Sequence, residues 1–107
     1  MNIVMQLHRA AVTDAQRAKY ERMVKARARK LSGAVQATVR LSEDGDQRRA
    51  EIVLDVARLP SIVVAAEGRW FATCVGLALD RLDARILKAK QTPKTRARRS
   101  RAAASRR

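Results

Sequence analysis

Apolar and polar positions alternate in three segments of the chain, and every second side chain in each segment is apolar. A period of two is typical of strands that bury one face. The three segments are residues 2–8, 35–41 and 51–56. Residues 62–66 form a short apolar run after a Leu-Pro-Ser break at 59–61, and we predict a fourth strand there.

Two longer segments have a helical period instead, residues 14–31 and 69–91. Thr13 is a suitable N-cap for the first, Gly33 a suitable stop after it, and Pro93 ends the second. Residues 43–46 suit a hairpin turn. The predicted order is β-α-β-β-β-α. We expect an α+β fold in which two helices pack on one face of a four-stranded mixed sheet.

Composition narrows the class of protein. The length suits one domain, residues 1–91, followed by an Arg-rich tail, residues 92–107, which has too few large apolar side chains to fold alone and is expected to be disordered. A single cysteine excludes an internal disulfide and suits the cytoplasm. The sequence lacks a run of about 18 apolar residues and a recognisable export signal, so we expect no membrane association.

The distribution of charge along the chain is the most informative part of the composition. The formal net charge is +14, and residues 91–107 contain seven basic side chains and no acidic one. The first ninety residues hold the other 17 basic side chains and all 10 acidic ones, so they still carry +7. Both parts therefore favour a polyanionic partner. The tail residues expected to add electrostatic affinity are Lys94, Arg96, Arg98, Arg99 and Arg101.

The two predicted helices separate apolar from basic side chains. Tyr20, Val24, Ala28 and Leu31 share one side of the first helix, and its basic residues occupy the broad opposite side. In the second helix a basic stripe lies beside the core stripe. The candidate RNA-binding residues are Lys19, Arg22, Lys25, Arg29, Lys30, Arg81, Arg85, Lys88 and Lys90. Two such ridges could track phosphate backbones and read shape rather than bases, although a merely solvated helix face is the alternative.

The remaining chemistry-bearing residues have simpler explanations. We expect His8 to be a polar strand end, Cys74 a small buried hydrophobe, and residues 43–46 a solvated acidic turn. Asp80 and Asp83 are expected to pair with the neighbouring arginines of their own helix.

Aromatic side chains are scarce, and only Tyr20, Trp70 and Phe71 are present. This scarcity argues against a protein that stacks many bases. Trp70 is expected at the edge of the core, with stacking on a base or ribose as the alternative. We find no nucleophile–base pair, phosphate-cradling glycine loop or metal-ligand set in the sequence, so we expect no enzyme, cofactor, metal or small-molecule substrate.

Several local patterns occur together in order. Ala66-Glu67-Gly68 precedes Arg69-Trp70-Phe71-Ala72-Thr73-Cys74-Val75, and Asp80-Arg81-Leu82 and Lys88-Ala89-Lys90 follow in the same helix. Val12-Thr13-Asp14-Ala15 and Arg29-Lys30-Leu31 bracket the first helix. With this element order, the chain from about residue 1 to residue 90 resembles the ribosome hibernation-promoting factor family, also called ribosome-associated inhibitor A or sigma-54 modulation proteins. Trp70, Phe71 and Ala72 stand where the family typically has Asp-Met-Tyr.

The resemblance implies a protein that is a monomer when free and binds the small ribosomal subunit and its ribosomal RNA. It would occupy the channel used by mRNA and transfer RNA, and stop translation by occupancy alone. Lys30, Arg81, Lys88 and Lys90 match basic positions of the family. Two alternatives stay open from the residues: a general binder of double-stranded RNA or DNA, and a protein-binding module that modulates transcription.

Overall fold

All six predicted elements are present in the predicted order. The computed structural model describes residues 1–91 of the 107-residue chain. The tail residues predicted to add electrostatic affinity, and the predicted disorder of residues 92–107, lie outside the described residues. The elements are β1 (Asn2–His8), α1 (Asp14–Ala28), β2 (Ala34–Asp44), β3 (Gln47–Val56), β4 (Ile62–Gly68) and α2 (Phe71–Lys90).

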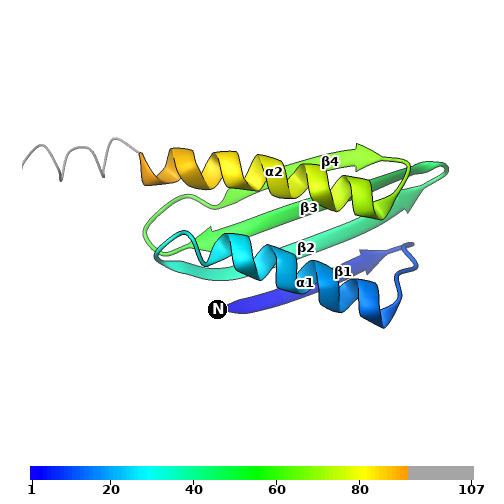
Figure 1. Ribbon diagram of the computed structural model, residues 1–107, viewed down its shortest axis with the longest axis horizontal. Coiled ribbons are helices and arrows are strands. Elements are labelled where there is room, and N and C mark those ends of the chain that lie inside the picture. Colours follow the sequence, from blue (N-terminus) through cyan, green and yellow to red (C-terminus); the bar gives the residue numbers. More distant parts are fainter. Residues whose placement is uncertain (92–107) are drawn as a thin grey trace, which may run out of the picture.

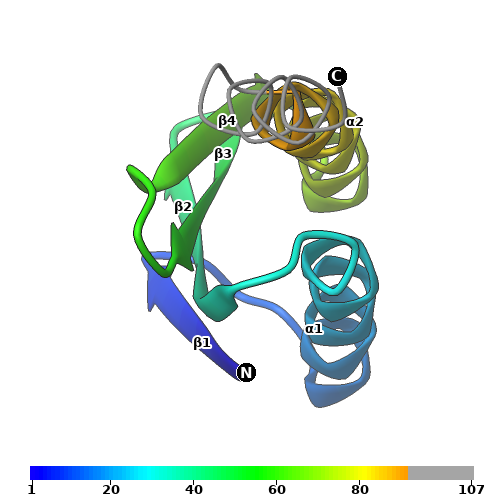
Figure 2. The same cartoon turned by 90° about the vertical axis from the view of Figure 1, so that its left-hand side faces the viewer.

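The four strands form one mixed sheet in the order β1-β2-β3-β4. β1 pairs with β2 in parallel, and the two following pairs are antiparallel. Figure 1 shows α1 and α2 running in the same direction, and Figure 2 shows both on one face of the sheet. The α+β architecture expected from the pattern is confirmed.

An aliphatic core lies between the sheet and the helices. Leu41, Ile52 and Leu54 from the sheet and Val24 and Leu82 from the helices are all inaccessible to solvent. These residues occupy the positions that the two periodicities predict, so one face of each element is removed from water. Cys74 is also inaccessible, as predicted, and burial raises the pKa of its thiol.

The beginning of α1 is capped as predicted, and by a reciprocal pair of hydrogen bonds. The backbone N–H of Gln16 donates to Oγ1 of Thr13 at 3.1 Å, and the backbone N–H of Thr13 donates to Oε1 of Gln16 at 3.0 Å. Two backbone donors that the helix leaves unpaired are thereby satisfied.

We expect Thr13→Ala to lower the free energy of unfolding by about 1 kcal/mol, because it removes the oxygen that accepts the Gln16 N–H. Urea denaturation followed by circular dichroism measures this change. Thr13→Ser keeps the hydroxyl and is the matched control. Equal stability of the alanine variant and the parent would show that this cap contributes nothing.

The end of α1 differs from the prediction. The helix ends at Ala28 rather than at Leu31, and a tighter turn follows in which the N–H groups of Lys30 and Leu31 donate to carbonyls three residues back. Leu31 still reaches the core, and Gly33, with a φ of +89°, redirects the chain into β2. Arg29 and Lys30 therefore lie in the turn beyond the helix.

The acidic turn is also shorter than predicted. β2 continues through Glu43 and Asp44, which leaves only Gly45 and Asp46 between the strands. Glu43 is opposite Arg48 in the strand register and binds its guanidinium at 2.8 Å. This cross-strand pair extends the ladder, so Glu43 is a sheet residue rather than part of a solvated turn.

Candidate nucleic-acid interface

Basic side chains gather at the end of the molecule where both helices finish. Because α1 and α2 run in the same direction, their C-terminal turns lie at the same end of the sheet (Figure 1). From residue 22 to residue 30 the chain has five basic side chains and no acidic one, and Lys88 and Lys90 occupy the last turn of α2. Positive charge in the last turn of each helix is favourable because helix C-termini carry partial negative charge. This surface, defined by Arg22, Lys25, Arg29, Lys30, Lys88 and Lys90, is called the basic end below.

The nine candidate RNA-binding residues all lie outside the core. Lys25 is half-buried and the other eight are exposed. Six of them belong to the basic end. Of the other three, Lys19 lies in the first half of α1, and Arg81 and Arg85 lie nearer the middle of α2.

The basic stripe of α2 faces the outer edge of the sheet rather than α1. Nη1 of Arg81 donates to the carbonyl oxygen of Ala65. Nη1 of Arg85 lies 3.5 Å from the carbonyl oxygen of Val63. Lys88 and Arg85 also line a shallow hollow with Ile62 at the start of β4. The ridge on α2 therefore borders β4, and the basic residues of the two helices do not merge into one stripe.

The side of α2 that faces α1 carries an acidic residue. Oδ2 of Asp83 lies 3.2 Å from Nε of Arg27, and Oδ1 lies 3.9 Å from Nζ of Lys30. The prediction that Asp83 pairs with Arg81 and Arg85 was wrong, because residues two positions apart on a helix point to nearly opposite sides. Asp83 is instead an interhelical ion-pair partner, and it offsets part of the charge of Lys30.

The ion pair of Arg27 and the exposure of Trp70 were not predicted from the sequence. Arg27 was not singled out, although it is only partly exposed and pairs with Asp83; its position three residues after Val24 on the core side was the available signal. Trp70 was expected at the core edge, but 62 % of its surface is exposed, and the neighbouring Phe71 is buried in its place.

We expect Asp83→Asn to change stability and RNA binding in opposite directions. Loss of the carboxylate removes the ion pairs with Arg27 of α1 and with Lys30 of the following turn, which at this degree of exposure lowers the free energy of unfolding by about 0.5–1 kcal/mol. It also frees the charge of Lys30, so affinity for an RNA polyanion rises a few-fold. Urea denaturation and binding at two salt concentrations measure the two effects. Asp80→Asn, on the exposed side of the same helix, is the control; identical behaviour of the two variants would refute the role of Asp83.

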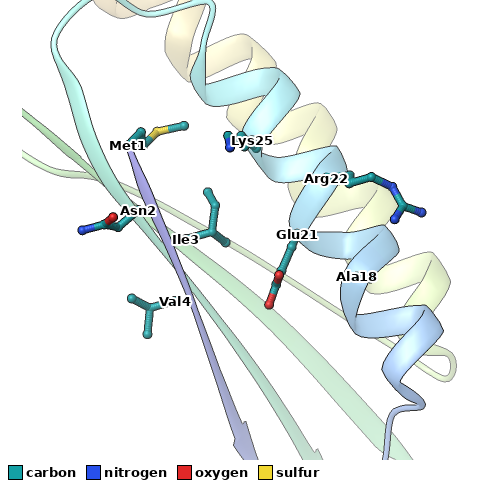
Figure 3. Close-up of a pocket in the computed structure, with 8 residues that line it drawn as sticks. All are labelled: Met1, Asn2, Ile3, Val4, Ala18, Glu21, Arg22 and Lys25. Carbon is teal, nitrogen blue, oxygen red and sulfur yellow. The ribbon is translucent and has the colours of Figure 1, made fainter.

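A hollow of about 600 Å³ separates β1 from α1 and includes two of the candidate residues, Arg22 and Lys25. Figure 3 shows Glu21 directed toward β1 and Arg22 directed away from it, on the outer side of the helix. Glu21 also binds Arg17 at 3.3 Å. The carboxylate makes the hollow itself a poor phosphate site, whereas Arg22 extends into solvent where a phosphate can approach.

Two other kinds of feature, a metal-ion site and a membrane-spanning helix, are absent from the described residues. Within residues 1–91 there is no group of three or more His, Cys, Asp or Glu side chains arranged to hold a metal ion. No helix in the same part of the chain is long and apolar enough to cross a membrane. His8 is exposed at the end of β1, as expected of a polar strand end.

A family model described as sigma 54 modulation protein / S30EA ribosomal protein matches residues 3–94. The chain belongs to this family. It is by family a ribosome-associated modulation protein, as the ordered motifs of the sequence predicted, and the family is not a known enzyme family.

Solved structures of similar proteins agree with this membership. The chain is 31 % identical to the N-terminal domain of Protein Y from Thermus thermophilus, with a TM-score of 0.70 and with 80 % of this chain and 96 % of that one covered. A ribosomal subunit interface protein from Coxiella burnetii has the same fold, with a TM-score of 0.71 at 14 % identity, and with 86 % of this chain and all of that one covered. No curated protein matches the chain in sequence.

Proposed function

We propose that this protein binds the small ribosomal subunit through ribosomal RNA and stops translation by occupying the channel used by mRNA and transfer RNA. The observation that carries the proposal is the basic end. The two parallel helices finish at the same end of the sheet (Figure 1), and each has basic residues in its last turn. Membership of a family of ribosome-associated proteins supports the choice of RNA among polyanions. In this proposal the protein performs no chemistry and acts as a monomer.

The contacts divide by side-chain type. The lysines act as point charges on phosphates, whereas the arginines can bind two phosphate oxygens at once. Arg81 and Arg85 use one nitrogen each on β4 carbonyls. A guanidinium has five N–H donors, so most of its donors stay available, and anchoring fixes the group before RNA arrives.

Recognition in this account is by shape. Phosphate contacts position a protein without reading sequence, and the grooves of folded RNA are largely recognised through backbone geometry. Two helices of fixed separation match one arrangement of phosphates better than others, which gives selectivity for a folded site over bulk RNA. We further propose that residues 1–91 form the binding domain and that residues 92–107 add electrostatic affinity.

Sedimentation tests the proposal directly. In a sucrose gradient at low salt the protein should migrate with small subunits, and it should inhibit translation in vitro in proportion to the bound fraction. Protein that stays at the top of the gradient would overturn the proposal.

Competition separates this function from its two alternatives. Displacement from ribosomes by an equal mass of bulk duplex RNA would favour a general duplex binder. Capture of a protein partner in RNA-free conditions, insensitive to salt, would favour a transcription modulator. Under the proposed function, ribosomes compete far better than bulk duplex, and binding weakens steeply with salt.

A further inference from the structure

A second surface lies at the end of the molecule opposite the basic end, where α2 begins and the β2–β3 hairpin turns (Figure 1). Its centre is Trp70, the residue that precedes α2, with 62 % of its surface exposed. It is the most exposed large apolar side chain of the described residues. The chain has only three aromatic residues, so a tryptophan left in water is not part of a general aromatic surface.

Two arginines adjoin the Trp70 ring. The Cζ atoms of Arg48 and Arg69 each lie 5.8 Å from the ring centroid, within the range of cation–π attraction. Arg48 is held in place from several directions: Nη2 binds Glu43 at 2.8 Å, Nη1 donates to the carbonyl oxygen of Arg69, and its Cζ lies 5.5 Å from the ring centroid of Phe71. The loop that carries Trp70 is thereby tied to the hairpin.

Arg69 differs from Arg48 in its charge balance. Among residues 1–91, Arg69 has no carboxylate within ion-pair distance, whereas Arg48 is neutralised by Glu43. The site therefore combines an open, fixed aromatic ring with one uncompensated cation beside it. An unpaired nucleotide has the complementary pair of groups, a flat base with a π face and an attached phosphate.

We propose that Trp70 and Arg69 bind an unpaired nucleotide of RNA, the base stacked on the indole ring and the phosphate on the guanidinium, with Arg48 as the positioning residue. This inference rests on the proposed function, which supplies ribosomal RNA as the partner. It adds a contact that depends on an unpaired base to a surface that otherwise contacts phosphates. Looped-out nucleotides of folded RNA present such bases, whereas fully paired duplexes do not.

The fluorescence of the only tryptophan in the chain tests the stacking directly. The full-length protein is titrated with a 12-nucleotide single-stranded oligoribonucleotide, with a duplex of the same length, and with small ribosomal subunits. Stacking on a base should quench the indole emission, so we expect strong quenching by the single strand and much weaker quenching by the duplex at equal saturation.

Variants then measure the contribution of the ring. Trp70→Ala should weaken binding of the single-stranded RNA about tenfold, with little change for the duplex, and Trp70→Phe should retain an intermediate affinity. Val35→Ala removes another exposed apolar side chain from β2 and is the matched control, expected to bind like the parent. Circular dichroism checks that each variant is folded.

The outcomes separate this inference from the proposed function. Subunit binding that is normal in Trp70→Ala, with no quenching by single-stranded RNA in the parent, would overturn the stacking site and leave the proposed function standing. Loss of subunit binding in Trp70→Ala without quenching by RNA would also overturn it, since the ring would then contact a ribosomal protein. A protein that quenches with single-stranded RNA but never binds subunits would keep the site and refute the proposed function.

Discussion

Replacing Arg29, Lys88 and Lys90 together by glutamine is expected to weaken binding to small ribosomal subunits about tenfold to a hundredfold near physiological salt. Each side chain lies at the basic end, is exposed, and makes no ion pair within residues 1–91. The logarithm of the affinity falls linearly with the logarithm of the salt concentration, and each phosphate contact contributes about 0.7–0.9 to the steepness of this line. Loss of three contacts should therefore reduce the steepness by about 2 to 3. Binding measured from 50 to 200 mM salt gives both quantities.

The matched control removes three positive charges from side chains that lie outside the basic end. Arg17, Arg40 and Arg49 are all paired with glutamates, and their triple replacement by glutamine gives the same net charge as the test variant. We expect a loss of less than about threefold, because only the long-range field changes. Equal losses in the two triple variants would mean that total charge, and not the basic end, governs binding.

Leu82→Ala is expected to lower the free energy of unfolding by about 2–5 kcal/mol. The Leu82 side chain belongs to the core and is inaccessible to solvent, so truncation leaves a cavity as well as losing burial. The total free energy of unfolding of a native protein is only about 5–15 kcal/mol, so this single change removes a large share of the stability. Urea denaturation at pH 7 measures it.

The control for this variant lies on the same helix. Leu87 is 59 % exposed, and Leu87→Ala should change the free energy of unfolding by less than about 0.5 kcal/mol. A similar cost at both positions would contradict the assignment of the buried face of α2. Since α2 also carries the candidate RNA-binding residues Arg81, Arg85 and Lys88, truncation of Leu82 should also reduce RNA binding by loosening that helix.

Much of the fold could be predicted because a strand or helix that buries one face has apolar residues at a regular spacing in the sequence. The alternation around Val39 and Ile52 and the helical spacing of Val24, Leu79 and Leu82 correspond to side chains that are all buried. Local chemistry also acts over a few residues, so the Thr13 cap could be predicted without knowing the partners of the helix.

What could not be predicted depends on contacts between distant parts of the chain. Asp83 pairs with Arg27 across two helices, and helical spacing within α2 alone carries no information about that neighbour. α1 ends before Leu31 because the chain must turn at Gly33 to enter β2, which is a constraint of the sheet rather than of helix propensity.

The position of the candidate residues outside the core could be predicted from the sequence, and their arrangement less well. The nine basic residues are outside the core as expected. The guanidinium groups of Arg81 and Arg85, however, contact backbone carbonyls of β4, and the ammonium group of Lys30 lies near the carboxylate of Asp83. Exposure of Trp70 was missed because an aromatic residue at a helix start is usually core, and its setting depends on Arg48 from the hairpin. Side-chain position on a helix wheel therefore indicates which basic residues lie outside the core but not how they are grouped.

We propose that the domain formed by residues 1–91, and not the charge of residues 92–107, selects a site in the channel of the small subunit. Crosslinking of the full chain and of residues 1–91 to small subunits, with mapping of the modified RNA positions, is the decisive test. We predict the same positions for both proteins, lining the mRNA and transfer RNA channel, with weaker binding and a smaller salt slope for the shortened chain. Crosslinks that lie outside the channel, or that move when residues 92–107 are removed, would contradict the claim.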